Sequence, residues 1–221
     1  MLTRVPDKTI FIVIECVDFD YLSSIRPKNI MSLEPHPARS FGATSRASIA
    51  AILGGFIPSC RYPNCYHHQI HFQDPFFLTN LKRDRFLYLA VPNGWALELL
   101  RPYIHDDLWS KLIRLHNKHS PYTTRELIED FLKIEKDLDK YFAYFHVMET
   151  HEPFYCPDNI VEYDERRKAA LLWIDEVIEP LLELDAFTLI MSDHNLEHDV
   201  PTCETIEAFI AGPSKKWLEV I

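Results

Sequence analysis

Short apolar runs alternate along the chain with longer segments in which apolar residues recur at helical spacing. The runs at residues 9–15 and 188–191 are apolar on both faces, which is typical of buried parallel strands. A shorter run at 206–211 predicts a half-exposed strand. Together, the apolar runs predict strands at 9–15, 86–91, 141–148, 188–192 and 206–211.

The segments between these runs predict helices. Residues 45–53 begin with hydroxyl side chains and end before two glycines, 75–81 are expected to be helical, and most of 95–138 has a helical pattern. In the last of these, a hydroxyl-rich start at 123–126 is expected to cap a helix, with one apolar face formed by Leu127, Phe131, Ile134 and Leu138. Residues 165–184 predict a further helix that Pro180 interrupts. Its inward face is expected to contain Ala169, Leu172, Ile174, Val177, Ile178 and Leu181.

Alternating strands and helices predict an α/β fold, a three-layer sandwich around a central, mostly parallel sheet. The 221 residues fit one domain, residues 1–221, without an internal repeat or a low-complexity linker. The stretch with prolines at 27, 35 and 37 is expected to be a loop.

Polar residues follow three of the predicted strands. Glu15 ends the first, Glu149 and His151 follow the third, and Asp193 and His194 follow the strand at 188–192. The carboxyl ends of parallel strands meet at one edge of the sheet, where α/β folds bind their ligands. Carboxylates and imidazoles gathered there require a cation, and a divalent metal is the natural one. Strand ends that simply face water are the alternative.

The helix at 45–53 adds a second chemical feature. Thr44, Ser45 and Ser48 lie at or near its N-terminus, where free amide groups and the helix dipole attract anions. A serine hydroxyl beside a metal at such a position is a credible activated nucleophile. A simple helix cap is the alternative interpretation.

Charge and cysteine content narrow the class of partner. A formal net charge of −10 argues against general nucleic-acid binding but permits a small anionic substrate if a metal supplies positive charge. Five cysteines, an odd number without a dense disulfide framework, favour a reduced, cytoplasmic setting. Neither a signal peptide nor an apolar run of about 18 residues is found, so no membrane role is expected. Cysteines and histidines cluster at 60–71, but their spacing matches no zinc pattern, which favours a surface loop.

Four segments in order resemble motifs of the alkaline phosphatase and sulfatase superfamily, of which this chain would be a compact member. The four segments are IFIVIECVDFDYL, TSRASIAAILGGFIP, FAYFHVMETHEPF and TLIMSDHN. They are similar to the first strand with its metal-binding acid, the nucleophile helix, a strand ending in a histidine segment, and the Ser-Asp-His-Gly motif.

The resemblance implies specific roles. Glu15, Asp193 and His194 would bind a divalent metal, zinc or manganese, and Ser45 would be the nucleophile, with Thr44 as second choice. His151 would bind the phosphoryl group or a second metal. His198 resembles a later histidine with which some members of the family also bind the phosphoryl group or a second metal. We predict His198 as a further metal ligand. We also predict that Arg46 contacts the substrate.

Two departures from the family pattern affect the predicted activity. Asn195 stands where the family usually has glycine, and no cysteine occupies the nucleophile position, which argues against a formylglycine sulfatase. The sequence therefore predicts a metal-dependent hydrolase of phosphate, or alternatively sulfate, esters. The competing hypotheses are a catalytically silent relative that binds a ligand or a protein, and a phosphoethanolamine-type transferase.

Overall fold

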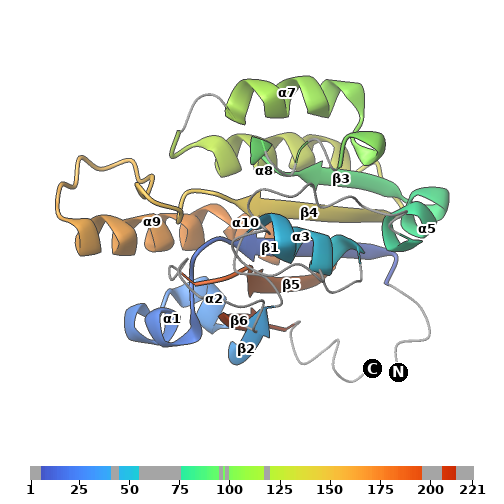
Figure 1. Ribbon diagram of the computed structural model, residues 1–221. Coiled ribbons are helices and arrows are strands. Elements are labelled where there is room, and N and C mark those ends of the chain that lie inside the picture. The colour runs from blue at the N-terminus through green and yellow to red at the C-terminus, as the bar shows by residue number, and fades with distance from the viewer. Residues whose placement is uncertain are drawn as a thin grey trace.

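The computed structural model describes residues 6–40, 45–54, 76–94, 97, 100–116, 120–195 and 206–212. Six strands form one sheet in the order β2-β6-β5-β1-β4-β3 (Figure 1). Four of them are parallel: β1 (Lys8–Ile14), β3 (Phe86–Ala90), β4 (Tyr141–Val147) and β5 (Phe187–Ser192). Two edge strands, β2 (His36–Ser40) and β6 (Ile206–Ala211), are added by antiparallel pairing. The predicted α/β fold with a mostly parallel central sheet is confirmed.

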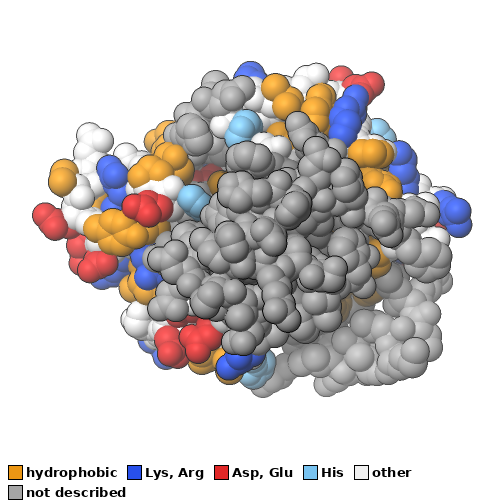
Figure 2. Space-filling model, in the orientation of Figure 1, with side chains coloured by type: hydrophobic (Ala, Val, Ile, Leu, Met, Phe, Trp, Pro, Cys, Tyr) orange, Lys and Arg blue, Asp and Glu red, His pale blue; other side chains and the backbone are white. Residues whose placement is uncertain are grey.

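Helices connect the strands and cover the sheet. The helices are α1 (Phe19–Ile25), α2 (Lys28–Met31), α3 (Ser45–Gly54), α5 (Phe76–Asp84), the 3-10 helix η1 (Arg101–Tyr103), α7 (Asp106–His116), α8 (Thr123–Glu135), α9 (Tyr163–Val177) and α10 (Glu179–Leu182). Within the described ranges, none of them is long and apolar enough to cross a membrane. Over α9, at the left of Figure 2, acidic, basic and hydrophobic side chains lie side by side on the surface.

The interior strand β4 shows why the sheet is covered on both faces. All seven of its residues are buried, and successive side chains point to opposite faces. On one face Tyr141 and Phe145 contact Phe131 of α8, with ring centroids 5.2 and 5.6 Å apart. On the other face Phe142 contacts Phe77 of α5 at 5.6 Å. Helices α8 and α5 therefore belong to opposite outer layers, as a three-layer sandwich requires.

One predicted loop is wrong. The stretch with prolines contains α2 and the strand β2, which pairs along its whole length with β6. A strand that includes Pro37 is tolerated because β2 is the outermost strand, where a missing backbone N–H interrupts no second ladder. The sequence of β2 is polar because the strand is exposed, so no apolar run indicates it.

The helix predicted at 165–184 is interrupted near Pro180, as expected, and appears as α9 and α10. Two of its predicted inward residues are wrong: Leu172 is 38% exposed and Ala169 is only partly buried, whereas Ala170 and Leu171 are fully buried. The predicted core position Ile134 of α8 is likewise 36% exposed. In both helices the element is right and the buried face is shifted.

Asp175 joins α9 to α2 through the backbone. Its two carboxylate oxygens accept hydrogen bonds from the backbone N–H groups of Asn29 and Ile30, at 2.9 and 2.8 Å. Pro27, at the N-cap of α2, provides no side-chain cap, so the buried Asp175 supplies it from a distant helix.

We predict that Asp175→Ala lowers the free energy of unfolding by about 2 to 4 kcal/mol, because two N–H groups lose their acceptor inside the protein. Asp175→Asn, which keeps one acceptor oxygen, should lose less. Urea denaturation measures both, and Glu176→Ala on the exposed side of α9 is the matched control, with an expected change within about 0.5 kcal/mol. Equal stabilities of the Asp175 and Glu176 variants would contradict the proposed cap.

Candidate functional site

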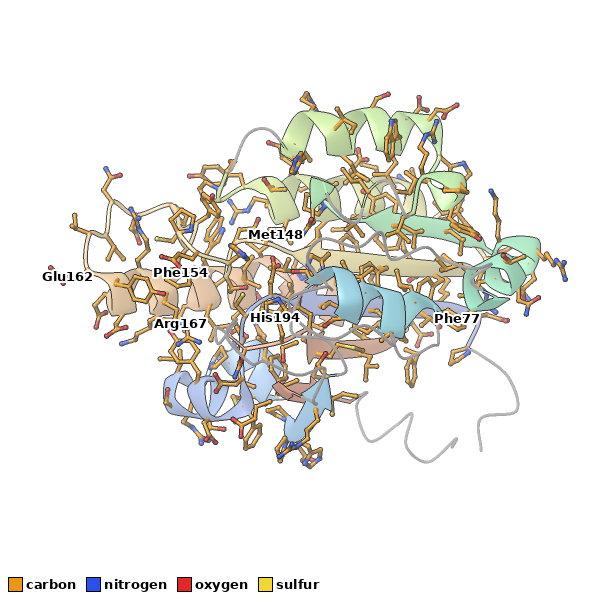
Figure 3. The ribbon with its side chains drawn as sticks, viewed as in Figure 1. Phe77, Met148, Phe154, Glu162, Arg167 and His194 are labelled. Atoms are coloured by element: carbon orange, nitrogen blue, oxygen red, sulfur yellow. The ribbon has the colours of Figure 1, made fainter. Side chains whose placement is uncertain are left out.

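Two carboxylates lie together where β1 and β5 end. The strands are parallel neighbours, with Ile14 paired to Ser192, so the residues that follow them, Glu15 and Asp193, leave the sheet at the same edge. Both side chains are almost completely buried, at 1% and 0% exposure. In Figure 3 the labels Met148 and His194 mark where the chain leaves the two strands on either side of β1.

Each carboxylate is only half satisfied. Asp193 Oδ1 accepts hydrogen bonds from the backbone N–H of His194 at 2.8 Å and of Cys16 at 3.3 Å. Its second oxygen, Oδ2, is buried and has no hydrogen-bond partner among the described residues, and the same holds for Glu15 Oε2. Burial, and next the charge of Asp193, raise the pKa of Glu15 well above its ordinary value.

His146 of β4 faces these unsatisfied oxygens. Its Nε2 atom lies 3.8 Å from Glu15 Oε2 and 3.9 Å from Asp193 Oδ2 and also has no hydrogen-bond partner within the described part. Burial lowers the pKa of His146 to about 4, so the ring is neutral near pH 7. The hydroxyl of Tyr144, 3.4 Å from Nδ1, can donate or accept, so the ring can leave the lone pair of Nε2 free for a metal.

His146 was not predicted as a ligand from the sequence. The residue lies within the strand, whereas the predicted ligands follow the strand ends. The available signal was a lone imidazole among the aromatic and aliphatic side chains of Tyr141–Val147.

His194 adds a second imidazole to the same edge. Its Nδ1 atom lies 2.6 Å from the carbonyl oxygen of Asn195, to which it can only donate, so Nε2 carries the lone pair. That Nε2 atom is 3.3 Å from Asp193 Oδ2 and 4.0 Å from Glu15 Oε1. Backbone hydrogen bonds that fix the ring tautomer in this way are common at metal-binding histidines.

Ser45 is the first residue of α3, and its hydroxyl points into this cluster. Its Oγ atom donates a hydrogen bond to Glu15 Oε1 and lies 3.3 Å from His194 Nε2. One turn later, Ser48 donates to the backbone carbonyl of Asp193 at 2.9 Å, which fixes the start of the helix against the end of β5. The structure therefore brings the predicted nucleophile to the predicted ligands.

The arrangement can hold a metal ion. One ligand atom from each of Glu15, His146 and Asp193 lies within 4.8 Å of the others. The unpaired atoms of this group are two carboxylate oxygens and one imidazole nitrogen, a donor set that suits zinc and manganese alike. A divalent cation would balance the two buried carboxylates and satisfy atoms that no described residue satisfies.

His151 lies in the loop after β4, at the border between this cluster and a cavity. It is partly exposed, and its Nδ1 atom lies 2.6 Å from the carbonyl oxygen of Glu152. The cavity has a volume of about 240 Å³, and its lining includes Asn93, His116, Met148 and His151.

Glu149, one of the polar residues after β4, caps helix α8 and does not join the carboxylate cluster of Glu15 and Asp193. Its two carboxylate oxygens accept hydrogen bonds from the backbone N–H of Thr124 at 2.7 Å and from its hydroxyl at 2.6 Å. The helix α8 starts at Thr123 as predicted, but the cap comes from Glu149 rather than from a hydroxyl-rich start. Burial raises the pKa of Glu149 to about 7 against these hydrogen bonds, which lower it.

Three other predicted features are not placed by the structure. Thr44, His198 and the cysteine and histidine cluster at 60–71 lie outside the described residues. Arg46 belongs to α3, but its side chain is likewise outside the described part. The substrate-binding role of Arg46 and the metal-binding role of His198 therefore stay predictions.

A mostly parallel sheet, with a serine-initiated helix packed against carboxylates at the strand ends, defines an alkaline-phosphatase-like fold. Comparison with solved structures confirms the predicted resemblance at the level of the fold. The sequence itself matches no protein-family model, and no curated protein matches it significantly.

Three similar structures illustrate the likeness. A protein of the alkaline phosphatase superfamily from Vibrio parahaemolyticus has a TM-score of 0.64 and 14% identity, covering 96% of this chain and 61% of its own. Phosphonoacetate hydrolase from Sinorhizobium meliloti, in complex with phosphonoformate, has a TM-score of 0.56 and 12% identity, and the match covers 87% of this chain and 56% of the hydrolase. The C-terminal periplasmic domain of EcEptC from Escherichia coli, in complex with zinc, has a TM-score of 0.53 and 13% identity, and the match covers 98% of this chain and 75% of the domain. The chain thus spans less than two thirds of the first two proteins.

We predict that Glu149 acts on stability rather than on metal binding. Glu149→Ala should lower the free energy of unfolding by about 2 to 4 kcal/mol, because the buried N–H and hydroxyl of Thr124 lose their acceptors. Glu149→Gln should lose less. Denaturant unfolding gives these values, and zinc titration should show unchanged affinity in Glu149→Gln. Glu152→Ala, in the same loop and exposed, is the control. A large loss of zinc affinity in Glu149→Gln would instead make Glu149 a ligand.

Proposed function

We propose that the protein is a metal-dependent hydrolase of phosphate esters in which Ser45 is the nucleophile. One observation carries the proposal: the Ser45 hydroxyl, at the N-terminus of α3, donates to Glu15 and lies 3.3 Å from His194 Nε2. A serine hydroxyl is a weak nucleophile at neutral pH, so a proton acceptor and a nearby cation are both needed to activate it.

The metal would be held by Glu15, Asp193 and the two imidazoles, His146 and His194. When bound, a divalent ion lowers the pKa of a neighbouring hydroxyl and polarises a phosphoryl oxygen. Zinc and manganese both suit this mixture of oxygen and nitrogen donors. The similar EcEptC domain was solved in complex with zinc, which supports a metal in a protein of this fold.

Two residues of the chain supply the nucleophile and the proton acceptor of the reaction. The Oγ atom of Ser45 forms a bond to phosphorus as the bond from phosphorus to the ester oxygen breaks, and the Oγ proton passes to Glu15. Backbone N–H groups at the N-terminus of α3 would donate to the phosphoryl oxygens as their charge grows. The departing alcohol oxygen takes a proton from solvent. Water then hydrolyses the phosphoserine, releasing phosphate and restoring Ser45.

The cavity beside His151 suits the alcohol part of a small ester. About 240 Å³ admits a small group rather than a polymer, and its lining combines apolar residues such as Leu115 and Met148 with polar ones such as Asn93 and His116. The phosphonoformate bound to the similar hydrolase supports a small anionic phosphorus compound as substrate.

We predict that zinc or manganese raises the melting temperature of the metal-free protein, and that His146→Ala removes most of this rise. Removing one ligand should lower metal affinity by on the order of 100-fold or more, because losing even an outer-shell partner lowers it 10- to 100-fold. Calorimetric metal titration measures it. His36→Ala, on the exposed edge strand β2, is the matched control. Unchanged affinity in His146→Ala would remove His146 from the site.

We predict that Ser45→Ala abolishes ester hydrolysis while the fold and most of the metal affinity are kept. The lost hydrogen bond to Glu15 costs about 1 to 3 kcal/mol, too little to unfold a domain of this size. A screen of phosphate mono- and diesters and sulfate esters, repeated with an acceptor alcohol, measures turnover. Trapped phosphoserine at residue 45 identifies the covalent intermediate.

Two variants serve as controls for Ser45. Ser24→Ala, on the exposed side of α1, should keep activity, and Thr44→Ala tests the neighbouring hydroxyl. Activity that survives in Ser45→Ala but not in Thr44→Ala would move the nucleophile to Thr44. A wild-type protein that binds metal tightly but turns over no ester would favour the silent relative, and turnover only with an acceptor alcohol would favour a transferase.

A further inference from the structure

Arg167 of α9 joins the turn after β1 to helix α1. Its Nη2 atom donates a hydrogen bond to the backbone carbonyl of Cys16 at 3.3 Å. The Cζ atom of the guanidinium group lies 3.5 Å from the ring centroid of Tyr21, and Nη2 lies 3.9 Å from Asp18 Oδ2. In Figure 3 the label of Arg167 lies between α9 and α1. The side chain is only 16% exposed, so these contacts fix the guanidinium group next to the residue that follows Glu15.

The residue that Arg167 contacts, Cys16, has an unusual backbone conformation. Its φ angle is 61°, in the left-handed region that a residue with a Cβ atom adopts only at a cost in free energy. Such a conformation persists where the surrounding contacts stabilise it. Cys16 is fully buried, so its carbonyl needs a hydrogen-bond donor inside the protein, and the guanidinium group of Arg167 supplies one.

The turn at Cys16 directs a backbone donor at the metal cluster. The N–H of Cys16 donates to Asp193 Oδ1 at 3.3 Å, and the N–H of His194 donates to the same oxygen at 2.8 Å. With Oδ1 engaged, the carboxylate presents Oδ2, which has no hydrogen-bond partner among the described residues, at 3.9 Å from His146 Nε2. A chain of hydrogen bonds therefore runs from Arg167 through Cys16 to a predicted metal ligand.

We propose that Arg167 is a positioning residue for the metal ligand Asp193. By holding the carbonyl of Cys16, it keeps the turn in the conformation in which the N–H of Cys16 binds Oδ1, and so keeps Oδ2 directed at the ion. Losing an outer-shell partner of a metal ligand typically lowers metal affinity 10- to 100-fold. This role rests on the proposed metal binding by Asp193 but not on Ser45 as nucleophile.

Zinc titration of variants of Arg167 tests the positioning role. Arg167→Met keeps the aliphatic stem but no donor, and should weaken the zinc affinity of the metal-free full-length protein about 10-fold or more. Arg167→Lys keeps the charge and a donor group and should recover part of this loss. A role in packing alone predicts equal losses, because both variants keep the stem and lose the planar group over Tyr21.

A spectroscopic measurement separates a misplaced ligand from a weakened fold. The visible spectrum of bound Co²⁺ depends on the geometry of its ligands. At saturating cobalt we expect a changed spectrum in Arg167→Met and a spectrum close to that of the wild type in Arg167→Lys. Circular dichroism verifies that each variant is folded. If Arg167→Met unfolds, Arg167→Gln takes its place, because the glutamine amide reaches only as far as the Nε position of arginine.

Lys168→Met is the matched control. Lys168 is the exposed neighbour of Arg167 on α9, and its replacement changes the net charge by the same amount. The control should keep the zinc affinity and the cobalt spectrum of the wild type. Unchanged zinc affinity in a folded Arg167→Met or Arg167→Gln, equal losses in Arg167→Lys and Arg167→Met, or the same loss in Lys168→Met would overturn the proposal.

The outcomes for Arg167 and for the proposed reaction are distinct. A wild type that binds zinc but turns over no ester, with zinc affinity falling from wild type to Arg167→Lys to Arg167→Met, would support the role of Arg167 and contradict the hydrolase. Ester turnover together with equal zinc affinity in wild type and Arg167→Met would do the reverse. A wild type that binds no zinc would overturn both.

Discussion

The burial of two carboxylates side by side is the constraint on which the rest of the site depends. Glu15 and Asp193 leave adjacent parallel strands at the same edge, and neither reaches solvent. Two such groups repel each other and lose their hydration, so burying both costs stability unless each oxygen is compensated. One oxygen of each carboxylate accepts hydrogen bonds, from backbone N–H groups in Asp193 and from Ser45 in Glu15. The other oxygen of each carboxylate faces the neutral ring of His146. This arrangement is understandable as a cation site and has no structural advantage of its own.

The order of the strands produces this constraint. With β1 between β4 and β5, residues near positions 15, 146 and 193 meet although they are far apart in the sequence. The same edge receives α3, because Ser48 binds the carbonyl of Asp193 and so fixes the helix one turn after Ser45. A change of strand order would separate the ligands, so the function we propose depends on topology as much as on the identity of the ligands.

The sequence predicted the parallel strands because each is covered on both faces and reads as an apolar run. It also predicted the meeting of Glu15, Asp193, His194 and Ser45, because parallel strands bring their carboxyl ends to one edge. It failed for β2, whose exposed position at the sheet edge allows a polar strand with a proline. His146 was not predicted as a ligand, because a residue before the end of a strand can still reach that edge. Leu172 was predicted to be buried but is exposed, because a small error in helix phase exchanges a buried position for an exposed one.

Glu149 and Glu15 both follow neighbouring strands, and their hydrogen bonds indicate a structural role for Glu149 and a metal-binding role for Glu15. Both oxygens of Glu149 accept hydrogen bonds from Thr124, so this side chain completes a helix cap and has no unsatisfied oxygen directed at the metal cluster. Glu15 has one oxygen bound to Ser45 and one without a partner, so it retains the capacity to bind a cation. The loop that carries His151 starts at Glu149, whose carbonyl also accepts the N–H of Tyr155. The cap on α8 therefore holds the loop that places His151 beside the cavity, so Glu149 positions the histidine that we predict to bind the phosphoryl group.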